Sequence, residues 1–171
     1  MYNDQYSFLV PAIGTWCAYK QEWTSKYKKI TYDTLLNANS NLAEDALNIV
    51  NGESKMFIKM FLNLFFYEGA FSAPQDGVYM ISFSYLALNS AGDSTYANVH
   101  VNNKRYEETI NAAYFTSGGS GQVASTGARS LYLELDTGDT VTIWATTIDN
   151  TGKLTRIIFC VQYVSKLVSN V

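Results

Sequence analysis

The chain has 171 residues, a formal net charge of −3 and a pI of about 5.1, and it contains one His and two Cys. Its length predicts a single domain with a substantial core, and a content of 15% aromatic and 16% charged residues excludes an intrinsically disordered chain. The acidic balance argues against nucleic-acid binding through a basic surface. One His and two Cys leave little material for metal chemistry, and no Cys/His cluster has zinc spacing.

The N-terminal residues, MYNDQYSFLVPAIG, include no basic stretch and only a short apolar run, so they lack the features of a signal peptide. We expect either a cytosolic protein or one whose leader is not visible in this sequence. Residues 1–12 are expected to form a leader segment, followed by one domain over residues 13–168.

The first strand is predicted over residues 13–20. Its alternation places Trp16 and Ala18 on one face and Cys17 and Tyr19 on the other.

A second strand is predicted over residues 30–36, with Ile30, Tyr32 and Thr34 facing together. The lysines before it, at positions 26, 28 and 29, are expected to form a solvated rim. The Asn-rich run that follows should end the strand.

Residues 53–69 contain an unusual apolar stretch, because nine of the eleven positions from Met56 to Phe66 are large and apolar. As a helix it would be apolar on nearly every side. It is too short and too interrupted to predict a membrane span. Two interpretations stay open: a helix that is buried or covered by a partner, or an insertion foreign to the fold.

The segment 69–85 carries the strongest pattern in the chain. A turn is predicted around Ala73-Pro74 and the following Gln-Asp-Gly, and beyond it the sequence alternates with a period of two. Four large side chains share one face of this strand: Tyr79, Ile81, Phe83 and Tyr85. This strand is expected to supply a large share of the core.

The rest of the chain is predicted to be β structure, with strands at residues 97–103, 106–115, 123–135, 141–147 and 156–164. The residues 136–139, Asp-Thr-Gly-Asp, are predicted to form a hairpin turn. His100 faces away from Val99 and Val101, and we expect it to be solvated or at a sheet edge. Short strands at roughly ten-residue spacing predict a sandwich, a jelly roll or a barrel.

The sequence provides no constellation for catalysis. A metal-dependent jelly-roll enzyme would need several His and Glu ligands, whereas this chain has one His. Asp136 and Asp139 flank a turn and are expected to shape it. Asp149 and Asn150 could offer oxygen ligands to calcium, but ordinary turn chemistry explains them equally well.

A run of the form F-x-A-P-x-x-G-x-Y-x-x-x-F resembles the signature of the complement C1q-type globular head domain. Here it is spelled by Phe71, Ala73, Pro74, Gly77, Tyr79 and Phe83. Later motifs of the same family are matched by Gly138, Asp139, Val141 and Phe159. The resemblance covers most of the chain, and the opening strands are similar to those of invertebrate members.

The resemblance implies an all-β, ten-stranded jelly roll of two antiparallel sheets, usually assembled as a trimer and secreted. In that fold the first and last strands are neighbours, so it also implies a disulfide between Cys17 and Cys160. We favour this pairing over two buried free thiols. Val161 stands where vertebrate members often have Gly, which indicates different packing near the trimer axis.

The resemblance also bears on the apolar stretch, because removing residues 53–69 would restore a short link that is typical of the family. We hypothesise that this stretch is translated intron, since Gly52-Glu53 can be encoded by a splice-donor-like string. Sequencing the mature transcript decides the matter, and messages that uniformly retain these codons would refute the hypothesis.

The resemblance implies a secreted, non-enzymatic recognition module that binds glycans or other surface ligands as a trimer, in the manner of an innate-immunity lectin. The alternative is a cytokine-like or matrix-forming trimer that binds a protein receptor or its own copies. No cofactor is expected apart from calcium at the candidate residues above, and neither nucleic acid nor a membrane span is expected.

Overall fold

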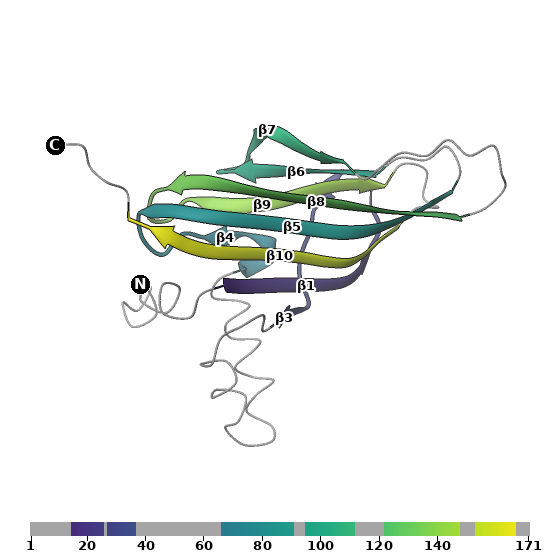
Figure 1. The fold of residues 1–171 in the computed structure, drawn as a ribbon, viewed down its shortest axis with the longest axis horizontal. Helices are drawn as coiled ribbons and strands as arrows, with labels where there is room; N and C mark the ends of the chain where they lie inside the picture. Colours follow the sequence, from purple (N-terminus) through teal and green to yellow (C-terminus); the bar gives the residue numbers. More distant parts are fainter. Residues whose placement is uncertain are drawn as a thin grey trace, which may run out of the picture.

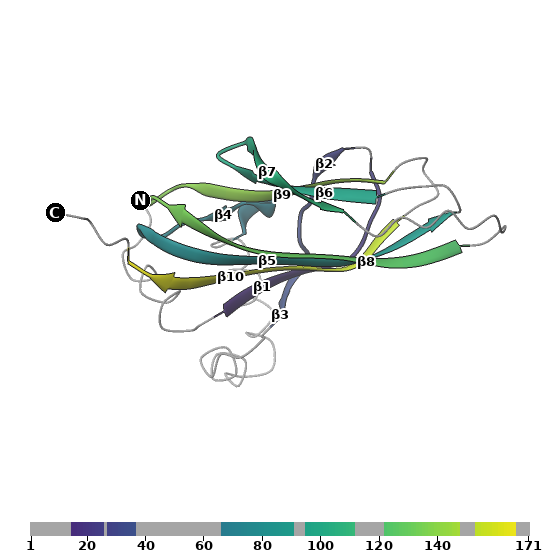
Figure 2. The same ribbon diagram turned by 45° about the horizontal axis from the view of Figure 1, so that its top comes forward.

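The computed structural model describes residues 15–25, 27–36, 66–90, 95–111, 122–147 and 153–166, and in these ranges the protein is a two-layer β sandwich (Figures 1 and 2). Several predictions fall outside the described residues and stay predictions. These are the leader segment, residues 53–65 of the apolar stretch and the calcium candidates Asp149 and Asn150.

Each layer is an antiparallel sheet. The first sheet has the order β3 (Thr34–Leu36), β1 (Thr15–Trp23), β10 (Lys153–Ser165), β5 (Gly77–Ser90) and β8 (Gln122–Leu135). The second has the order β2 (Lys28–Lys29), β9 (Thr140–Thr147), β6 (Thr95–Val101) and β7 (Lys104–Asn111), and β4 (Phe71–Ser72) also pairs with β9. A short 3₁₀ turn, η1 (Tyr67–Gly69), precedes β4. The jelly-roll prediction is confirmed.

The core lies between the two sheets, and β5 provides its centre. Tyr79, Ile81, Phe83 and Tyr85 are all at most 3% exposed, as their alternation predicts. Phe159 of β10, directly opposite Phe83, is fully buried beside them. Because β5 has β10 on one side and β8 on the other, its inward side chains are flanked by neighbouring strands on both sides.

The prediction of one strand over residues 30–36 is wrong. The chain crosses between the sheets here: the Ile30 N–H donates to the Ile143 carbonyl in the second sheet (2.9 Å), and the Asp33 N–H donates to the Tyr19 carbonyl in the first (2.9 Å). Ile30 and Tyr32 are buried as expected, while Thr34 is half-buried. Alternation reports burial correctly, but it does not report which sheet each residue joins.

The turn at residues 136–139 is not a hairpin, which corrects a second prediction. It follows β8 in the first sheet and leads into β9 in the second, so it joins the two layers. Two hydrogen bonds to Ala73 hold it: the Ala73 N–H donates to the Asp139 carbonyl, and the Gly138 N–H donates to the Ala73 carbonyl, each at 2.8 Å. Because the turn is hydrogen-bonded to Ala73, the strand that follows it can join the second sheet instead of pairing with β8.

A β-bulge near the start of β10 aligns its side chains with the core. The register against β5 shifts between Thr155 and Ile158, and Arg156 has a φ of 49°. In a regular strand Leu154 and Ile157 would face opposite sides, because they are three residues apart. The bulge turns both into the core, where each is fully buried.

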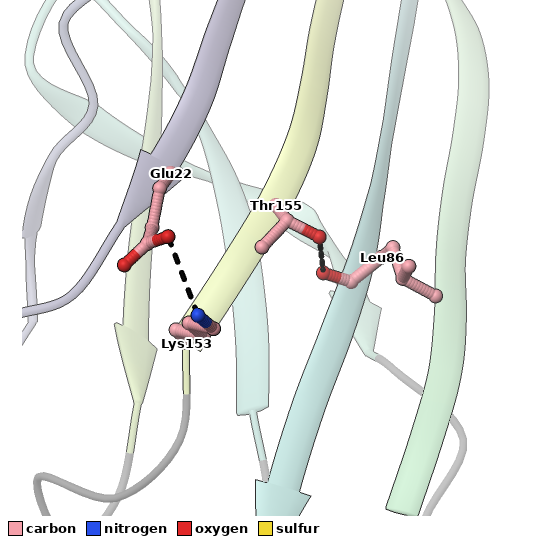
Figure 3. Close-up of polar contacts among 4 residues, drawn as sticks. All are labelled: Glu22, Leu86, Lys153 and Thr155. Carbon is pink, nitrogen blue, oxygen red and sulfur yellow. Dashed lines mark hydrogen bonds and ion pairs between the residues drawn. The ribbon is translucent and has the colours of Figure 1, made fainter.

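Two side chains just before this bulge connect β10 to both neighbouring strands (Figure 3). Lys153 Nζ lies 3.3 Å from Glu22 Oε2 of β1, and Thr155 Oγ1 donates to the Leu86 carbonyl of β5 at 3.3 Å. The ion pair is largely exposed, so it adds little to stability and serves mainly to orient the strand end.

The last residues of the apolar stretch belong to the core. Phe66 is 2% exposed, and its ring centroid lies 5.4 Å from that of Phe159, 6.0 Å from that of Phe71 and 6.2 Å from that of Tyr32. Gly69 has a φ of +81°, and a Cβ there would lie 2.0 Å from the Ile30 carbonyl oxygen. The intron hypothesis stays open, but any excision that includes Phe66 would leave a gap in the core.

Replacing Phe66 by Ala should therefore lower the free energy of unfolding by about 3–5 kcal/mol, because it opens a cavity among aromatic rings. Urea or guanidinium denaturation measures this change. Tyr67→Ala is a matched control, since Tyr67 is 60% exposed and should lose no more than about 0.5 kcal/mol. Equal losses for the two variants would show that Phe66 is not part of the stable core.

Candidate interaction surfaces

The signature residues lie in the core and in one end of the sandwich. Phe71, Tyr79, Phe83 and Phe159 are each at most 2% exposed. The Tyr79 hydroxyl donates to the Gln75 carbonyl at 2.7 Å, which anchors the turn before β5.

The small and acidic signature residues shape the backbone around that turn. A Cβ on Gly77 would lie 2.5 Å from Cε2 of Tyr163, and Gly138 has a φ of +90°. Asp139 accepts hydrogen bonds from Asn102 Nδ2 (2.8 Å) and from the Asp136 N–H (2.9 Å). These contacts give the signature a structural role at this end, beside the half-buried Pro74.

The outward face of the first sheet is crossed by a row of small side chains. Cys17 lies opposite Cys160, Cys160 opposite Ser82, and Ser82 opposite Ser130. Cys17 and Cys160 form a disulfide, as the resemblance implied, and the Ser82 and Ser130 hydroxyls are 3.0 Å apart. The disulfide covalently links the first and last strands, which are 143 residues apart in the sequence.

Two further rows, one on each side of this central row of small side chains, complete what we call the uncharged face. One row contains Gln162, Met80 and Tyr132, and the other contains Tyr19, Ile158, Ser84 and Ala128. No side chain in these three rows is charged. Tyr132 is 65% exposed, although it is large and aromatic. Covering this face would remove apolar surface from water without desolvating an ion.

The outward face of the second sheet has a different chemistry. In the part of the chain that the structure describes, the buried polar residues all come from β6 and β9: Thr95, Asn98, His100, Thr142 and Thr146. All but Thr95 alternate with the inward apolar residues of these strands, so they point away from the core. Side chains on an outer face are usually solvated, and their burial here requires a cover.

Tyr27, from the segment just before β2, covers two of them, Asn98 and His100. Its hydroxyl lies 2.7 Å from His100 Nε2, and Asn98 Nδ2 donates to it at 3.4 Å. Its ring centroid is 5.5 Å from that of Trp144 and 6.2 Å from that of Tyr96. We call these five residues the Tyr27 cluster.

His100 corrects a further prediction. It faces away from Val99 and Val101 as expected, but it is only 9% exposed and is not solvated. It stacks on Trp144, with ring centroids 5.0 Å apart and planes 20° apart. The prediction was wrong because Tyr27 comes from a segment 73 residues away, which the pattern around His100 cannot reveal.

Burial favours the neutral forms of His100 and Tyr27. It lowers the pKa of His100, with a smaller contribution from the positive charge of Arg105. The Asn103 carbonyl favours the charged ring, but no hydrogen bond of ordinary length reaches Nδ1, so burial has the larger effect. Burial also raises the pKa of Tyr27. Because Tyr27 accepts from Asn98, its own proton can point at Nε2, which leaves the ring proton on Nδ1.

The described residues contain no group of three or more His, Cys, Asp or Glu side chains arranged to hold a metal ion. Within the same residues, no helix is long and apolar enough to cross a membrane. The candidate functional features described above are two faces, one uncharged and one built around Tyr27.

No protein-family model and no curated protein matches this sequence. Solved structures do match. The globular domain of zebrafish complement 1qA protein superposes with a TM-score of 0.52 at 14% identity, covering 90% of this chain and 98% of that one. Eiger TNF from S. frugiperda gives a TM-score of 0.52 at 11% identity, covering 92% of this chain and 98% of that one. The chain has the C1q/TNF-like fold.

The C1q/TNF-like fold agrees with the signature but does not point to the Tyr27 cluster, which sequence reasoning missed. A partial signal was available, since Tyr96, Asn98 and His100 alternate with apolar residues on β6, and Trp144 does so on β9. That alternation could have marked a shared outward face. Nothing near Tyr27 in the sequence indicates that its ring covers the outward face of β6 and β9.

The pH dependence of stability between about pH 5 and pH 7 should come from His100, the only histidine in the chain. Its pKa in the folded state is lowered from 6.5, so the folded protein binds fewer protons than the unfolded chain. This contribution is fully present above 6.5 and is lost as pH falls through the folded pKa. Urea unfolding at about pH 7.5 and about pH 5 should show lower stability at the acidic value, and His100→Gln should remove most of that difference.

Asp76→Asn is the matched control for this experiment. Hydrogen bonds from the Thr137 hydroxyl and N–H lower the pKa of Asp76 from 3.8, so its contribution is lost only as pH falls below that value. The control should therefore show the same difference in stability between the two pH values as the wild type. A His100→Gln protein that also keeps it would contradict the assignment to His100.

Proposed function

We propose that this protein is a non-enzymatic, extracellular recognition module that assembles as a homotrimer and binds glycans or other surface ligands, in the manner of an innate-immunity lectin. The uncharged face is the observation that carries the proposal. It spans β1, β10, β5 and β8, and the small side chains in its central row let another β surface approach closely.

The composition of this face favours a second copy of the chain as its partner. Ser82 and Ser130 are hydrogen-bonded to each other, so covering the pair leaves one hydroxyl proton to be satisfied instead of two. Tyr132 offers a large aromatic anchor of the kind found at the centre of interfaces. Three linked heads would raise the avidity of a weak individual site.

The absence of an enzymatic role is part of the proposal. The single histidine is held between Tyr27 and Trp144, and its pKa is lowered by burial. In that arrangement its bonded partner is a phenol with a raised pKa, which is a poor nucleophile near pH 7. Such a constellation supports binding rather than covalent chemistry.

A cytokine-like or matrix-forming trimer is the second candidate. It is favoured by the structural similarity to Eiger TNF, whose TM-score of 0.52 equals that of the complement domain. This candidate would use the same uncharged face for assembly but would bind a protein receptor or its own copies.

Sedimentation analysis tests the assembly. The wild-type chain should sediment at three times its 19.1 kDa mass. Ser82→Arg should yield folded monomers, because it places a charge at the centre of the covered face. Tyr67→Arg, at an exposed position in η1 outside both sheets, is the control and should remain trimeric. A wild-type monomer, or a trimer that survives Ser82→Arg, would refute assembly through this face.

A glycan and polyanion array, probed with the protein clustered on beads, tests the ligand class. Specific binding that a calcium chelator removes would indicate a calcium-assisted lectin, with Asp149 and Asn150 as the proposed ligands. Binding that survives chelation would keep the lectin without the metal. If no glycan or polyanion binds in either condition, the lectin proposal is contradicted and the protein-binding trimer is favoured.

A further inference from the structure

We propose that the Tyr27 cluster is a saccharide-binding site that Tyr27 closes in the free protein. This inference rests on the proposed recognition function and locates ligand binding at the Tyr27 cluster. The site would accept a six-membered sugar ring that carries a free hydroxyl group.

The first argument is the concentration of buried polar groups on an outward face. Asn98 is completely buried and His100 is 9% exposed, although both point away from the core. Burying polar groups is costly unless partners satisfy them, and the Asn103 backbone, which favours the charged ring, comes no closer to His100 Nδ1 than a long contact. A fold that keeps such groups on its outer sheet face gains nothing in core packing from them.

The second argument is the shape of the cover itself. The ring centroids of Tyr27, His100 and Trp144 form a triangle with sides of 5.0, 5.5 and 6.1 Å. Tyr27 thus places a six-membered ring beside Trp144 and a hydroxyl on His100 Nε2 and the Asn98 amide. A pyranose has a ring of similar size, an apolar face for the indole and hydroxyl groups for the same two partners.

The third argument is the way in which Tyr27 is held. It is 40% exposed and precedes β2, which has only two residues and pairs with β9 alone. Detaching Tyr27 breaks its hydrogen bond to His100 and its ring contacts, but it leaves the core unchanged. A sugar that replaces these contacts would compensate for their loss, so the closed and open states can exchange.

Two positive charges lie near the cluster and bear on which sugars it would bind. Lys29 lies opposite Trp144 in the β2–β9 register, and the positive charge of Arg105 acts on both Tyr27 and His100. The test should therefore compare neutral sugars with a carboxylated one. The aromatic and hydrogen-bonding contacts are common to both kinds.

The experiment exploits the fact that His100 is the only histidine. The imidazole NMR signals of the full chain are followed while a hexose, an N-acetylhexosamine and a hexuronic acid are titrated in separately. At least one sugar should shift the His100 signals. Trp144→Leu should weaken binding by at least about tenfold through loss of the stacking surface, and Tyr27→Ala should strengthen it because the competing ring is gone.

Tyr106→Ala is the matched control, since Tyr106 is an exposed aromatic residue of β7 outside the cluster. It should bind like the wild type, and far-ultraviolet circular dichroism confirms that each variant is folded. Sugar binding that leaves the His100 signals unchanged and survives Trp144→Leu would overturn this site while preserving the lectin function. Failure of all three sugars with both the wild type and Tyr27→Ala would overturn the site, and silence on the glycan array as well would overturn the lectin function.

Discussion

The packing of alternate side chains between the two sheets determines every other feature of this molecule. Phe83 and Phe159 face each other across β5 and β10 in the first sheet, and Val99 and Ile143 do so across β6 and β9 in the second. Since side chains alternate along a regular strand, these buried residues fix the direction of their neighbours outside the bulges. The two outer faces are therefore consequences of the core, and a one-residue slip in either sheet would destroy both of them.

The two outer faces differ in their chemistry and in the kind of contact that they favour. The uncharged face leaves an exposed Tyr132 among small side chains, which favours contact with another copy and imposes no desolvation of ions. The Tyr27 cluster instead hides polar groups beneath an aromatic ring, which favours exchange with a ligand that can replace that ring. In the proposed trimer, separate faces for assembly and for ligand binding would let three heads act together without blocking one another's sites.

The sequence predicted the features that depend on local alternation or on the C1q-type signature. The core face of β5, the type of fold and the pairing of Cys17 with Cys160 belong to this group. Features that depend on which distant segments meet could not be predicted. The crossing at residues 30–33 is set by hydrogen bonds to two different sheets, and the turn at 136–139 is set by its bonds to Ala73. Alternation records only whether a side chain is buried.

The candidate site was less predictable than the fold for the same reason. The outward alternation of His100 is visible in the sequence, but its cover arrives from a position 73 residues earlier. The role of Phe66 was hidden in a comparable way, because an apolar run of that length gives no indication of which of its rings enters the core. In both cases, one long-range aromatic contact determined the outcome.

Hydroxyl-radical footprinting across a dilution series tests the division of labour between the two faces most directly. Oxidation of Tyr132 and Tyr27 can be read from the same digest by mass spectrometry, and both residues are at least 40% exposed in the single chain. The account predicts that raising the protein concentration protects Tyr132 and leaves Tyr27 as reactive as before. Protection of Tyr27 with continued oxidation of Tyr132 would place the assembly surface on the second sheet and contradict the account.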